Sequence, residues 1–476
     1  MPKQKRTKIV ATLGPATSKK ETLKAMIAEG VDVFRINFSH ANYEDVKERI
    51  KMIRTLGEEM NTTTAILADL QGPKLRVGMM SEEAVVQPGD IIKFCTGKEF
   101  EGTSKKVYMN YDNFPKDVNV GERILLDDGK LIFKVLETNK KDEVTAEVVQ
   151  GGPLRSKKGV NLPNTNISLP ALTKKDKEDA IFAISQEVDW IALSFVRHAD
   201  DLKELQALIE AHSEYKIPII AKIEKPEAVE NIDKIVAYCD GLMVARGDLG
   251  VEVPAQEVPL IQKELVLTAK RARIPVIIAT QMMETMITSL TPTRAEVNDV
   301  ANSVMDGADA VMLSGETSVG SYPVDVIKTM TKICKSVENS SLITVPHEPP
   351  HIRTNRYITK SVCYHAATMA NEISAKAICT LTNSGYTAFQ ISAWRPDAHI
   401  LVYTSNRRIL SRLNLLWGVK SFYYDKFVST DETVDDVNNI AHQRGFVEKG
   451  DYLINLAAMP IVDKGMVNTL RVSQVK

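Results

Sequence analysis

The amino-acid sequence predicts an α/β protein: a (β/α)8 TIM barrel with an inserted small all-β domain and a C-terminal α/β domain. Three observations carry this prediction. Short apolar runs alternate with helical patterns, the alternation stops in one long stretch, and a new alternation begins after a polar linker rich in proline. With 476 residues, the chain has room for about two to four domains of ordinary size.

The barrel strands are expected where nearly continuous apolar runs end in turn residues, a pattern typical of parallel strands covered on both faces. These runs are Lys8–Leu13, Val31–Phe38, Thr64–Leu70, Trp190–Phe195, Pro218–Ile223, Gly241–Ala245, Pro275–Thr280 and Ala310–Leu313. Helical periodicity fills the segments between them, for example over Lys20–Ala28, Lys175–Ser185 and Val258–Ala272.

The inserted domain is expected between Val77 and about Ile167. Here short polar and β-branched runs are separated by turns, of which Leu126-Asp-Asp-Gly129 has the form of a hairpin connection. The barrel is therefore assigned to residues 1–76 and 168–343, and the inserted β-barrel-like domain to residues 77–167.

The C-terminal domain, residues 344–476, is expected after the Pro-rich segment Thr344–Arg356. A new set of elements follows this linker. It comprises helices over Ser361–Asn371 and Tyr386–Ala393 and strands over Ala377–Leu381, Ile400–Tyr403, Val419–Tyr424 and Tyr452–Leu456.

Charge and cysteine content exclude several classes of protein. Lys and Arg number 60 against 61 Asp and Glu, so we expect no nucleic-acid or membrane-surface partner. The five cysteines are scattered and contain no Cys-x-x-Cys pair, which favours buried free thiols. The sequence has neither a signal-peptide pattern nor an apolar stretch of about 18 residues, which predicts a cytoplasmic protein.

The carboxyl ends of the predicted barrel strands carry unusually polar residues, and these ends form the catalytic face of a barrel. Glu224 and Asp248 end neighbouring strands and could hold one divalent cation such as Mg²⁺. Alternatively, they are ion-pair partners of Lys222 and Arg246.

Three cations, Arg35, Lys222 and Arg76, follow strands at the same mouth of the barrel. They suit a phosphorylated anionic substrate, although a solvated rim would also contain Arg and Lys. Ser314 and His40 also follow strands, but a lone serine without a nearby histidine and a possible surface histidine do not indicate a chemistry by themselves.

Taken together, these residues closely resemble the pyruvate kinase family, and the resemblance spans nearly the whole chain. The matching blocks are Lys8–Thr17, Arg35–His40, Lys158–Pro163, Met243–Gly250, Ala279–Met282, Pro292–Glu296 and Met312–Thr317. The resemblance implies phosphoryl transfer from phosphoenolpyruvate to ADP, giving pyruvate and ATP in the last step of glycolysis. It also implies a homotetramer and a Mg²⁺ (or Mn²⁺) cofactor.

By this resemblance, Glu224 and Asp248 would hold Mg²⁺, and Arg35 and Lys222 would grip the substrate phosphate. The backbone around Gly247 and Asp248, with the Thr280 hydroxyl, would bind the carboxylate. Thr280, Ser314 and Glu316 are the implied ends of a proton relay to the methylene carbon. The implied nucleotide contacts are Asn37, His40, Arg76 and Lys158. The inserted domain would act as a lid that excludes water.

One departure from the family concerns its potassium site. Potassium-dependent members carry Asp-Thr-Lys-Gly-Pro-Glu-Ile-Arg at the third strand, where this chain has Asp69-Leu-Gln-Gly-Pro-Lys-Leu-Arg76. Leu70 lacks the hydroxyl ligand, and Lys74 could take the place of the ion, whereas Asn37, Ser39 and Asp69 keep the other positions of the site. We therefore expect activity that does not require K⁺.

An effector site is the least specific prediction. The loop residues Thr382, Asn383, Ser384, Gly385 and Thr387 precede or begin a predicted helix and resemble the family's effector-phosphate loop, although an ordinary capped helix start explains them almost as well. Tyr386 departs from the Arg often found there. A sugar monophosphate or AMP is therefore as plausible an effector as fructose 1,6-bisphosphate.

Two other readings of the sequence compete with this one. A metal-dependent aldolase or lyase acting on phosphoenolpyruvate or pyruvate would also place two carboxylates at a barrel mouth, but it gives no reason for the inserted lid or for Lys158. A non-catalytic regulatory barrel would be expected to have lost at least one of Arg35, Lys222, Glu224, Asp248 or Thr280, and all five are present.

Overall fold

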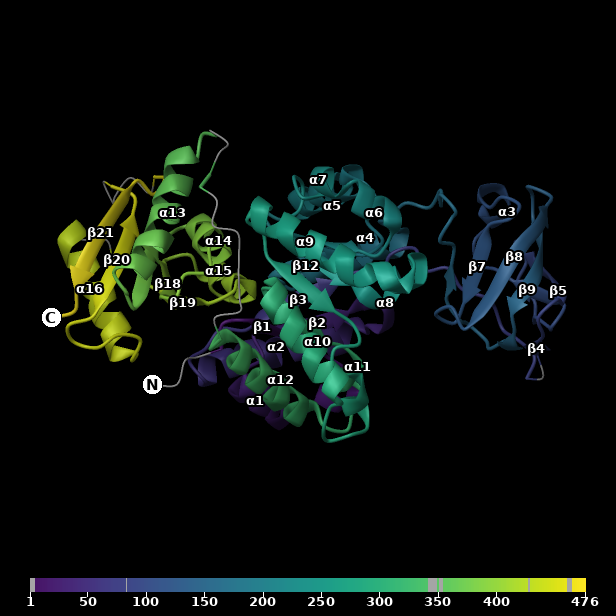
Figure 1. Cartoon of the computed structure of the whole chain (residues 1–476), viewed down its shortest axis with the longest axis horizontal. Coiled ribbons are helices and arrows are strands. Elements are labelled where there is room, and N and C mark those ends of the chain that lie inside the picture. Colours follow the sequence, from purple (N-terminus) through teal and green to yellow (C-terminus); the bar gives the residue numbers. More distant parts are fainter. Residues whose placement is uncertain (1–4, 83, 341–348, 351–353, 427–428, 460–464) are drawn as a thin grey trace.

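The computed structural model of the chain describes residues 5–82, 84–340, 349–350, 354–426, 429–459 and 465–476, and the side chains of His40 and Thr430 lie outside this description. Three bodies follow one another along the long axis of the molecule (Figure 1). The barrel occupies the middle, the inserted domain stands at one end, and the C-terminal domain lies at the other.

Eight parallel strands close into a barrel in the order β1-β16-β15-β14-β13-β12-β3-β2, which confirms the predicted fold class. Each predicted barrel strand is present within one to two residues of its expected ends. The strands are β1 (Lys8–Thr12), β2 (Val33–Asn37), β3 (Ala65–Asp69), β12 (Trp190–Leu193), β13 (Ile219–Ile223), β14 (Gly241–Ala245), β15 (Val276–Ala279) and β16 (Ala310–Leu313). Almost all of their side chains are buried, because some face the barrel interior and the others face the surrounding helices.

Helices surround the barrel, and several begin at residues that cap them well. Thr173 and Thr293 each form a capping box, with Asp176 and Glu296 respectively, and thereby start α4 and α10. The helices are α1 (Lys20–Glu29), α2 (Tyr43–Glu59), α4 (Lys174–Ser185), α5 (Ala199–His212), α6 (Pro226–Glu230), α7 (Ile232–Ile235), α8 (Arg246–Glu252), α9 (Val258–Ala272), α10 (Arg294–Asp306), α11 (Gly315–Ser318) and α12 (Pro323–Glu338). Short 3-10 turns are η1 (Pro15–Thr17), η2 (Phe38–His40), η3 (Ala255–Glu257) and η4 (Glu284–Ile287).

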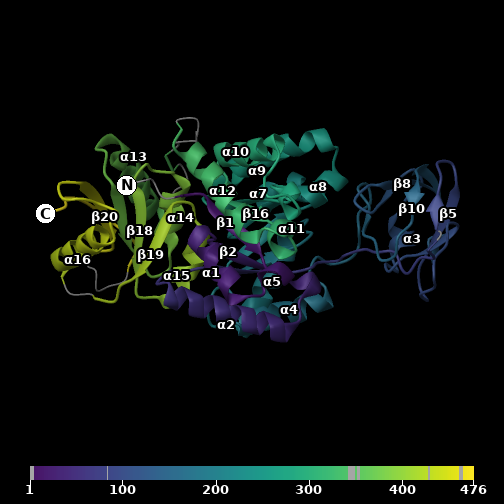
Figure 2. The ribbon, with the colours of Figure 1, turned by 90° about the horizontal axis from the view of Figure 1, so that it is seen from below.

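The inserted domain has its own apolar core and extends away from the barrel, to which two chain segments join it (Figures 1 and 2). A six-stranded sheet of order β11-β7-β8-β9-β5-β6 and a two-stranded sheet β10-β4 form it. The predicted hairpin is present, because Leu126 pairs with Leu131 across the Asp-Asp-Gly turn. Its elements are β4 (Val85–Val86), β5 (Ile91–Cys95), β6 (Lys106–Tyr108), α3 (Phe114–Asp117), β7 (Arg123–Leu126), β8 (Leu131–Thr138), β9 (Glu143–Gln150), β10 (Gly152–Pro153) and β11 (Val160–Asn161).

The C-terminal domain is a five-stranded sheet of order β19-β18-β17-β20-β21 covered by helices. The sequence predicted four of these strands, but not the antiparallel edge strand β21. The elements are α13 (Tyr357–Glu372), β17 (Ala377–Leu381), α14 (Tyr386–Ala393), β18 (His399–Thr404), α15 (Arg407–Arg412), η5 (Leu413–Leu415), β19 (Val419–Tyr423), α16 (Thr430–Gln443), β20 (Tyr452–Ala457) and β21 (Thr469–Gln474).

The N-terminal ends of the barrel strands rest on the C-terminal domain, and we call this contact region the joint. Trp190, the first residue of β12, donates its indole N–H to the carbonyl oxygen of Arg412 at 3.0 Å. Two further tryptophans lie at the joint. Arg273 stacks on Trp394 with its guanidinium carbon 3.4 Å from the ring centre, and Arg6 lies 5.3 Å from the ring centre of Trp417. The joint leaves the opposite, carboxyl ends of the strands free for a site.

The joint also buries Lys8, the first residue of β1, whose side chain is 1% exposed. Its Nζ donates to the carbonyl oxygen of Val419 at 2.9 Å and lies 3.6 Å from a carboxylate oxygen of Asp32. Asp32 also pairs with Lys5. Burial outweighs the attraction of Asp32 and lowers the pKa of Lys8 to about 7.

This lowered pKa predicts a pH-dependent contribution of Lys8 to stability. In the unfolded chain the pKa returns to about 10.4, so between pH 7 and pH 10 the unfolded chain binds the proton more tightly and the folded state gains stability as pH rises. Lys8→Met removes this titration. We expect the melting temperature of the variant, relative to wild type, to be highest below pH 7 and to fall steadily towards pH 10, as measured by calorimetry.

The exposed residue Lys47 on α2 offers a matched control, because Lys47→Met removes an amine that lies in solvent. Its melting temperature relative to wild type should change little over the same pH range. A difference between Lys8→Met and wild type that stays constant from pH 6.5 to pH 10 would contradict the titration of Lys8.

Candidate active site

Charged side chains from three strands meet at the carboxyl ends of the barrel. Arg35 extends from β2, Asp69 ends β3, and Lys222 lies on β13. Arg35 Nε donates to Asp69 Oδ2 at 2.6 Å, and Lys222 Nζ lies 3.2 Å from Asp69 Oδ1. The barrel thus brings together two of the predicted phosphate-binding cations, and Asp69 lies between them.

Burial and charge oppose each other at this cluster. The Asp69 side chain is 1% exposed, and this burial alone would raise its pKa, yet Lys222 and Arg35 outweigh it and hold the pKa of Asp69 below its usual value. For Lys222, burial would lower the pKa, but Asp69 and Glu224 outweigh it and raise the pKa. Asp69 and Lys222 are therefore both charged at neutral pH.

Glu224 follows β13 and is buried. Its Oε1 lies 2.9 Å from Lys222 Nζ, and its Oε2 accepts a hydrogen bond from the backbone N–H of Phe195 at 2.8 Å. Burial raises the pKa of Glu224, and the negative charge of Asp248 adds to this effect, whereas Lys222 opposes it. Asp248, half-buried in the first turn of α8, thus lies close enough for the two carboxylates to act on each other.

The alternative in which both carboxylates are ion-pair partners is correct for one of them. Glu224 pairs with Lys222, but Arg246 engages Asp299 instead of Asp248, with two contacts of 2.6 and 2.7 Å. Two carboxylates suit a hard cation such as Mg²⁺, which takes one or two protein carboxylates and fills its other positions with water and substrate oxygens. A cluster of three or more Asp, Glu, His or Cys, as a fully protein-coordinated metal needs, is absent from the described part of the chain.

Thr280 follows β15 in a conformation that a β-branched residue rarely adopts, with φ at +70°. Its hydroxyl accepts the backbone N–H of Gly247 at 2.7 Å, and Arg246 donates to its carbonyl oxygen at 2.7 Å. These contacts tie Thr280 to the start of α8, where Gly247 and Asp248 lie. The three residues predicted to bind a carboxylate are therefore neighbours.

Ser314 and Glu316 lie together after β16. The Glu316 carboxylate accepts backbone N–H groups of Ser314 at 2.7 Å and of Met283 at 3.1 Å, and burial raises its pKa. No direct bond from this carboxylate to Thr280 is found among the described residues. A relay over these three residues would therefore need a water molecule between them.

The expected nucleotide-binding residues are divided between two bodies. Arg76 and Gly159 form a bridge at the base of the inserted domain, and Lys158 pairs there with Asp127 at 2.9 Å. Asn37 lies at the barrel mouth, where its side chain accepts the backbone N–H of Ser39 at 3.1 Å. The side chain of His40 lies outside the described residues.

At the expected potassium position, Leu70 is buried and Lys74 is exposed. Arg35 and Lys222 already balance the charge of Asp69. The ion pairs among the described residues include none of Lys74, so its substitution for the ion stays a prediction.

Three contributors to the barrel mouth were missed from the sequence: Thr12, Ser194 and Asp299. Thr12 accepts a hydrogen bond from Arg35 at 3.0 Å, and Ser194 accepts one from Lys222 at 2.6 Å. Thr12 and Ser194 fall inside the apolar runs taken as strands, at their carboxyl ends. Examining every polar residue at a strand end would have found these two, but Asp299 lies within α10 and carries no such signal.

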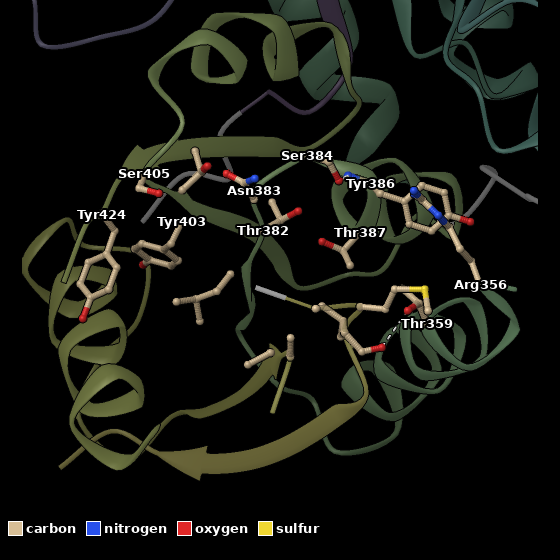
Figure 3. A pocket seen from close by; sticks show the side chains of 17 residues that line it. Arg356, Thr359, Thr382, Asn383, Ser384, Tyr386, Thr387, Tyr403, Ser405 and Tyr424 are labelled. Atoms are coloured by element: carbon tan, nitrogen blue, oxygen red, sulfur yellow. Dashed lines mark hydrogen bonds between the residues drawn. The ribbon is translucent and has the colours of Figure 1, made fainter. Parts of the chain in front are cut away.

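A second candidate site is a cavity of about 320 Å³ in the C-terminal domain, on the far side of the barrel from the mouth (Figure 3). Four of the five predicted effector residues line it: Thr382, Asn383, Ser384 and Thr387. Gly385 takes the left-handed conformation (φ +81°) that starts α14, and its backbone N–H donates to the Thr382 hydroxyl at 3.0 Å. Arg356 covers the ring of Tyr386 at one edge of the cavity.

The closed barrel and its charged mouth are typical of a (β/α)8-barrel enzyme, and comparison with known proteins identifies the class as transferase. Models of the pyruvate kinase barrel domain and of the pyruvate kinase alpha/beta domain match residues 4–327 and 360–473. The chain belongs to the pyruvate kinase family.

Individual relatives support this assignment over the full length. Pyruvate kinase 2 of Synechocystis sp. is 42% identical over 100% of this chain and 80% of its own length, and the pyruvate kinase of Mycobacterium tuberculosis is 39% identical over 99% and 98%. A crystal structure of a pyruvate kinase from Cryptosporidium parvum superposes with a TM-score of 0.92 at 32% identity, covering 99% of this chain and 97% of that one.

Among the described residues, no helix has the length and apolar character needed to cross a membrane.

The guanidinium group of Arg246 bonds to the Asp299 carboxylate and to the Thr280 carbonyl oxygen, so we predict that replacing Arg246 lowers the stability of the protein. A lysine at this position cannot reproduce two bonds to Asp299 together with the bond to Thr280. We expect Arg246→Lys to lose about 1–3 kcal/mol of stability, seen as a melting temperature lowered by a few degrees, and to reduce turnover because Thr280 is no longer held.

Arg271→Lys, at an exposed position on α9, serves as the matched control and should change neither quantity. If Arg246→Lys has the melting temperature and turnover of wild type, the guanidinium group of Arg246 does not hold Thr280 in place.

Proposed function

We propose that the protein transfers the phosphoryl group of phosphoenolpyruvate to ADP, giving pyruvate and ATP, with Mg²⁺ (or Mn²⁺) held by Glu224 and Asp248. The observation that carries the proposal is the buried cluster of Arg35, Asp69, Lys222 and Glu224, with Asp248 close enough to act on Glu224. Cations and carboxylates side by side at a barrel mouth match a substrate that is both phosphorylated and metal-bound.

For this reaction the protein mainly has to position the two substrates and stabilise the charge of the transition state. A terminal oxygen of ADP attacks phosphorus, and the bond between phosphorus and the enol oxygen breaks. Lys222 and Arg35 donate to the phosphoryl oxygens, on which negative charge is distributed in the transition state. The metal, when bound, supplies further positive charge to the phosphate and carboxylate oxygens. Holding these charges in a buried mouth lowers the barrier without any covalent intermediate.

The substrate carboxylate would be held at the start of α8. Its oxygens would accept from backbone N–H groups around Gly247 and Asp248 and from the Thr280 hydroxyl, which would have to turn away from the carbonyl oxygen of Ala279 that it contacts at 2.6 Å. Enolpyruvate then takes a proton at its methylene carbon, which produces the methyl group of pyruvate. Glu316, whose pKa burial raises, and Ser314 are suited to pass that proton through water and Thr280.

The inserted domain would close over the mouth and bring Arg76 and Lys158 to the nucleotide phosphates. Two chain segments join it to the barrel in Figures 1 and 2, and such connections support this motion. Asn161 on β11 bonds to Glu252 on α8 at 2.9 Å and marks where the inserted domain already touches the barrel.

The first test is pyruvate formation from phosphoenolpyruvate, ADP and Mg²⁺ by wild type and by Lys222→Met. We expect turnover in the wild type that EDTA abolishes, and a loss of about 100-fold or more in the variant, because the transferring group loses its buried cation. Lys203→Met, on the outer helix α5, is the matched control and should turn over like wild type. Absence of turnover in the wild type would contradict the proposed reaction.

Parallel assays in sodium-free Tris buffer with and without K⁺ separate the reaction from the role of Lys74. Turnover that changes little on addition of K⁺ agrees with the substitution of Lys74 for the ion. A strong K⁺ requirement would leave the reaction intact and contradict that substitution.

We further propose that the cavity of the C-terminal domain binds a phosphorylated effector through the loop 382–387. Ser384→Asp should abolish activation by sugar monophosphates or AMP, because a carboxylate repels the phosphate, while turnover without effector continues at the distant barrel mouth. Ser384→Ala, which removes only the hydroxyl, should weaken activation less. Activation that is unchanged in Ser384→Asp would place the effector elsewhere.

A further inference from the structure

Ser194 occupies a buried position beside the proposed phosphate-binding lysine. It is the first residue after β12, and it is 2% exposed. Its hydroxyl donates to the carbonyl oxygen of Leu70 at 2.7 Å and accepts from Lys222 Nζ at 2.6 Å. A hydroxyl has one hydrogen, and because Leu70 takes it, a lone pair of the oxygen is left facing the ammonium group.

The ammonium group of Lys222 has three contacts with neighbouring oxygens. It donates a hydrogen bond to Ser194 Oγ, and it forms ion pairs with Glu224 Oε1 at 2.9 Å and with Asp69 Oδ1 at 3.2 Å. To donate to a substrate phosphate, Lys222 has to weaken one of these contacts. Each carboxylate keeps a partner on its other oxygen if its contact with Lys222 weakens, since Asp69 Oδ2 bonds to Arg35 and Glu224 Oε2 to the Phe195 N–H. Ser194 is the neutral acceptor, and it is fixed to the backbone of the neighbouring strand.

The backbone around Ser194 is itself rigidly placed. Gly72 packs against it at φ +71°, and a Cβ on Gly72 would lie 3.0 Å from Ser194 Cβ and 2.7 Å from Phe195 Cδ2. The next residue, Phe195, holds Glu224 through its N–H and has a φ of +54°. The end of β12 therefore contacts the lysine through a side chain and the carboxylate through the backbone.

We propose that Ser194 is a positioning residue that keeps the Lys222 ammonium group in the barrel mouth while Lys222 exchanges a carboxylate partner for the substrate phosphate. The inference rests on the proposed function of Lys222 and adds a residue to it. Ser194 does not touch the reacting atoms. Its effect on catalysis passes through the location of the lysine alone.

Two variants test the proposal, Ser194→Ala and Ser194→Thr, with three measurements on each. The measurements are kcat and KM for phosphoenolpyruvate, the melting temperature, and the affinity for Mn²⁺ from electron paramagnetic resonance. In Ser194→Ala we expect kcat to fall about 10- to 100-fold, because a displaced lysine stabilises the transition state less, while KM changes less than about 3-fold. Mn²⁺ affinity should stay within about 3-fold, because the Phe195 N–H still holds Glu224.

The conservative variant and a matched control separate positioning from stability. Ser194→Thr restores a hydroxyl and should recover kcat to within about 3-fold of wild type. Ser303→Ala, at a buried serine of α10 whose hydroxyl has no hydrogen-bond partner among the described residues, should leave kcat unchanged.

Three results would overturn the inference. Equal turnover by Ser194→Ala and wild type would show that the hydroxyl does not position Lys222, while leaving the proposed function in place. A parallel fall of kcat, Mn²⁺ affinity and melting temperature that Ser194→Thr does not reverse would assign Ser194 a purely structural role. An inactive wild type would overturn the proposed function and this inference together.

Discussion

Four charged side chains buried at one end of a closed barrel are the constraint on which the rest of the site depends. Arg35, Asp69, Lys222 and Glu224 carry two positive and two negative charges when all are ionised, and removing any one leaves an uncompensated charge in a poorly solvated place. Their carboxyl-end position on parallel strands is what allows them to meet. The inserted domain can then stand apart, because the cluster is balanced without it.

The fold could be predicted from sequence to the extent that each element buries a continuous apolar face. The barrel strands are nearly all apolar, so they could be recognised one by one, and α9 begins and ends where the pattern indicates. The antiparallel strand β21 could not be recognised in this way. Its residues are half-buried or exposed, and it is held chiefly by pairing with β20. Such a strand depends on its neighbour and leaves little apolar pattern of its own.

The residues of the site also fall into those that the sequence predicts and those that it does not. Residues whose charge is unusual at a strand end, such as Lys222 and Glu224, could be found from sequence, because a charge is costly to bury and stands out against the apolar run around it. Small neutral side chains at strand ends can be located in the sequence, but the charged group that each one contacts cannot be predicted without coordinates. Ser194 is one example, and Thr280 is another in part, since its left-handed backbone and its bond to Gly247 have no signature in the sequence. The partner of Arg246 was also unpredictable, because Asp299 lies 53 residues further along the chain.

The joint between barrel and C-terminal domain has a practical consequence for spectroscopy. The chain contains three tryptophans, and all of them contact this joint. Intrinsic tryptophan emission therefore reports on how the C-terminal domain is seated against the base of the barrel, and the inserted domain has no tryptophan of its own. Native fluorescence would therefore follow changes at the C-terminal domain. An added fluorophore would be needed to follow a motion of the inserted domain.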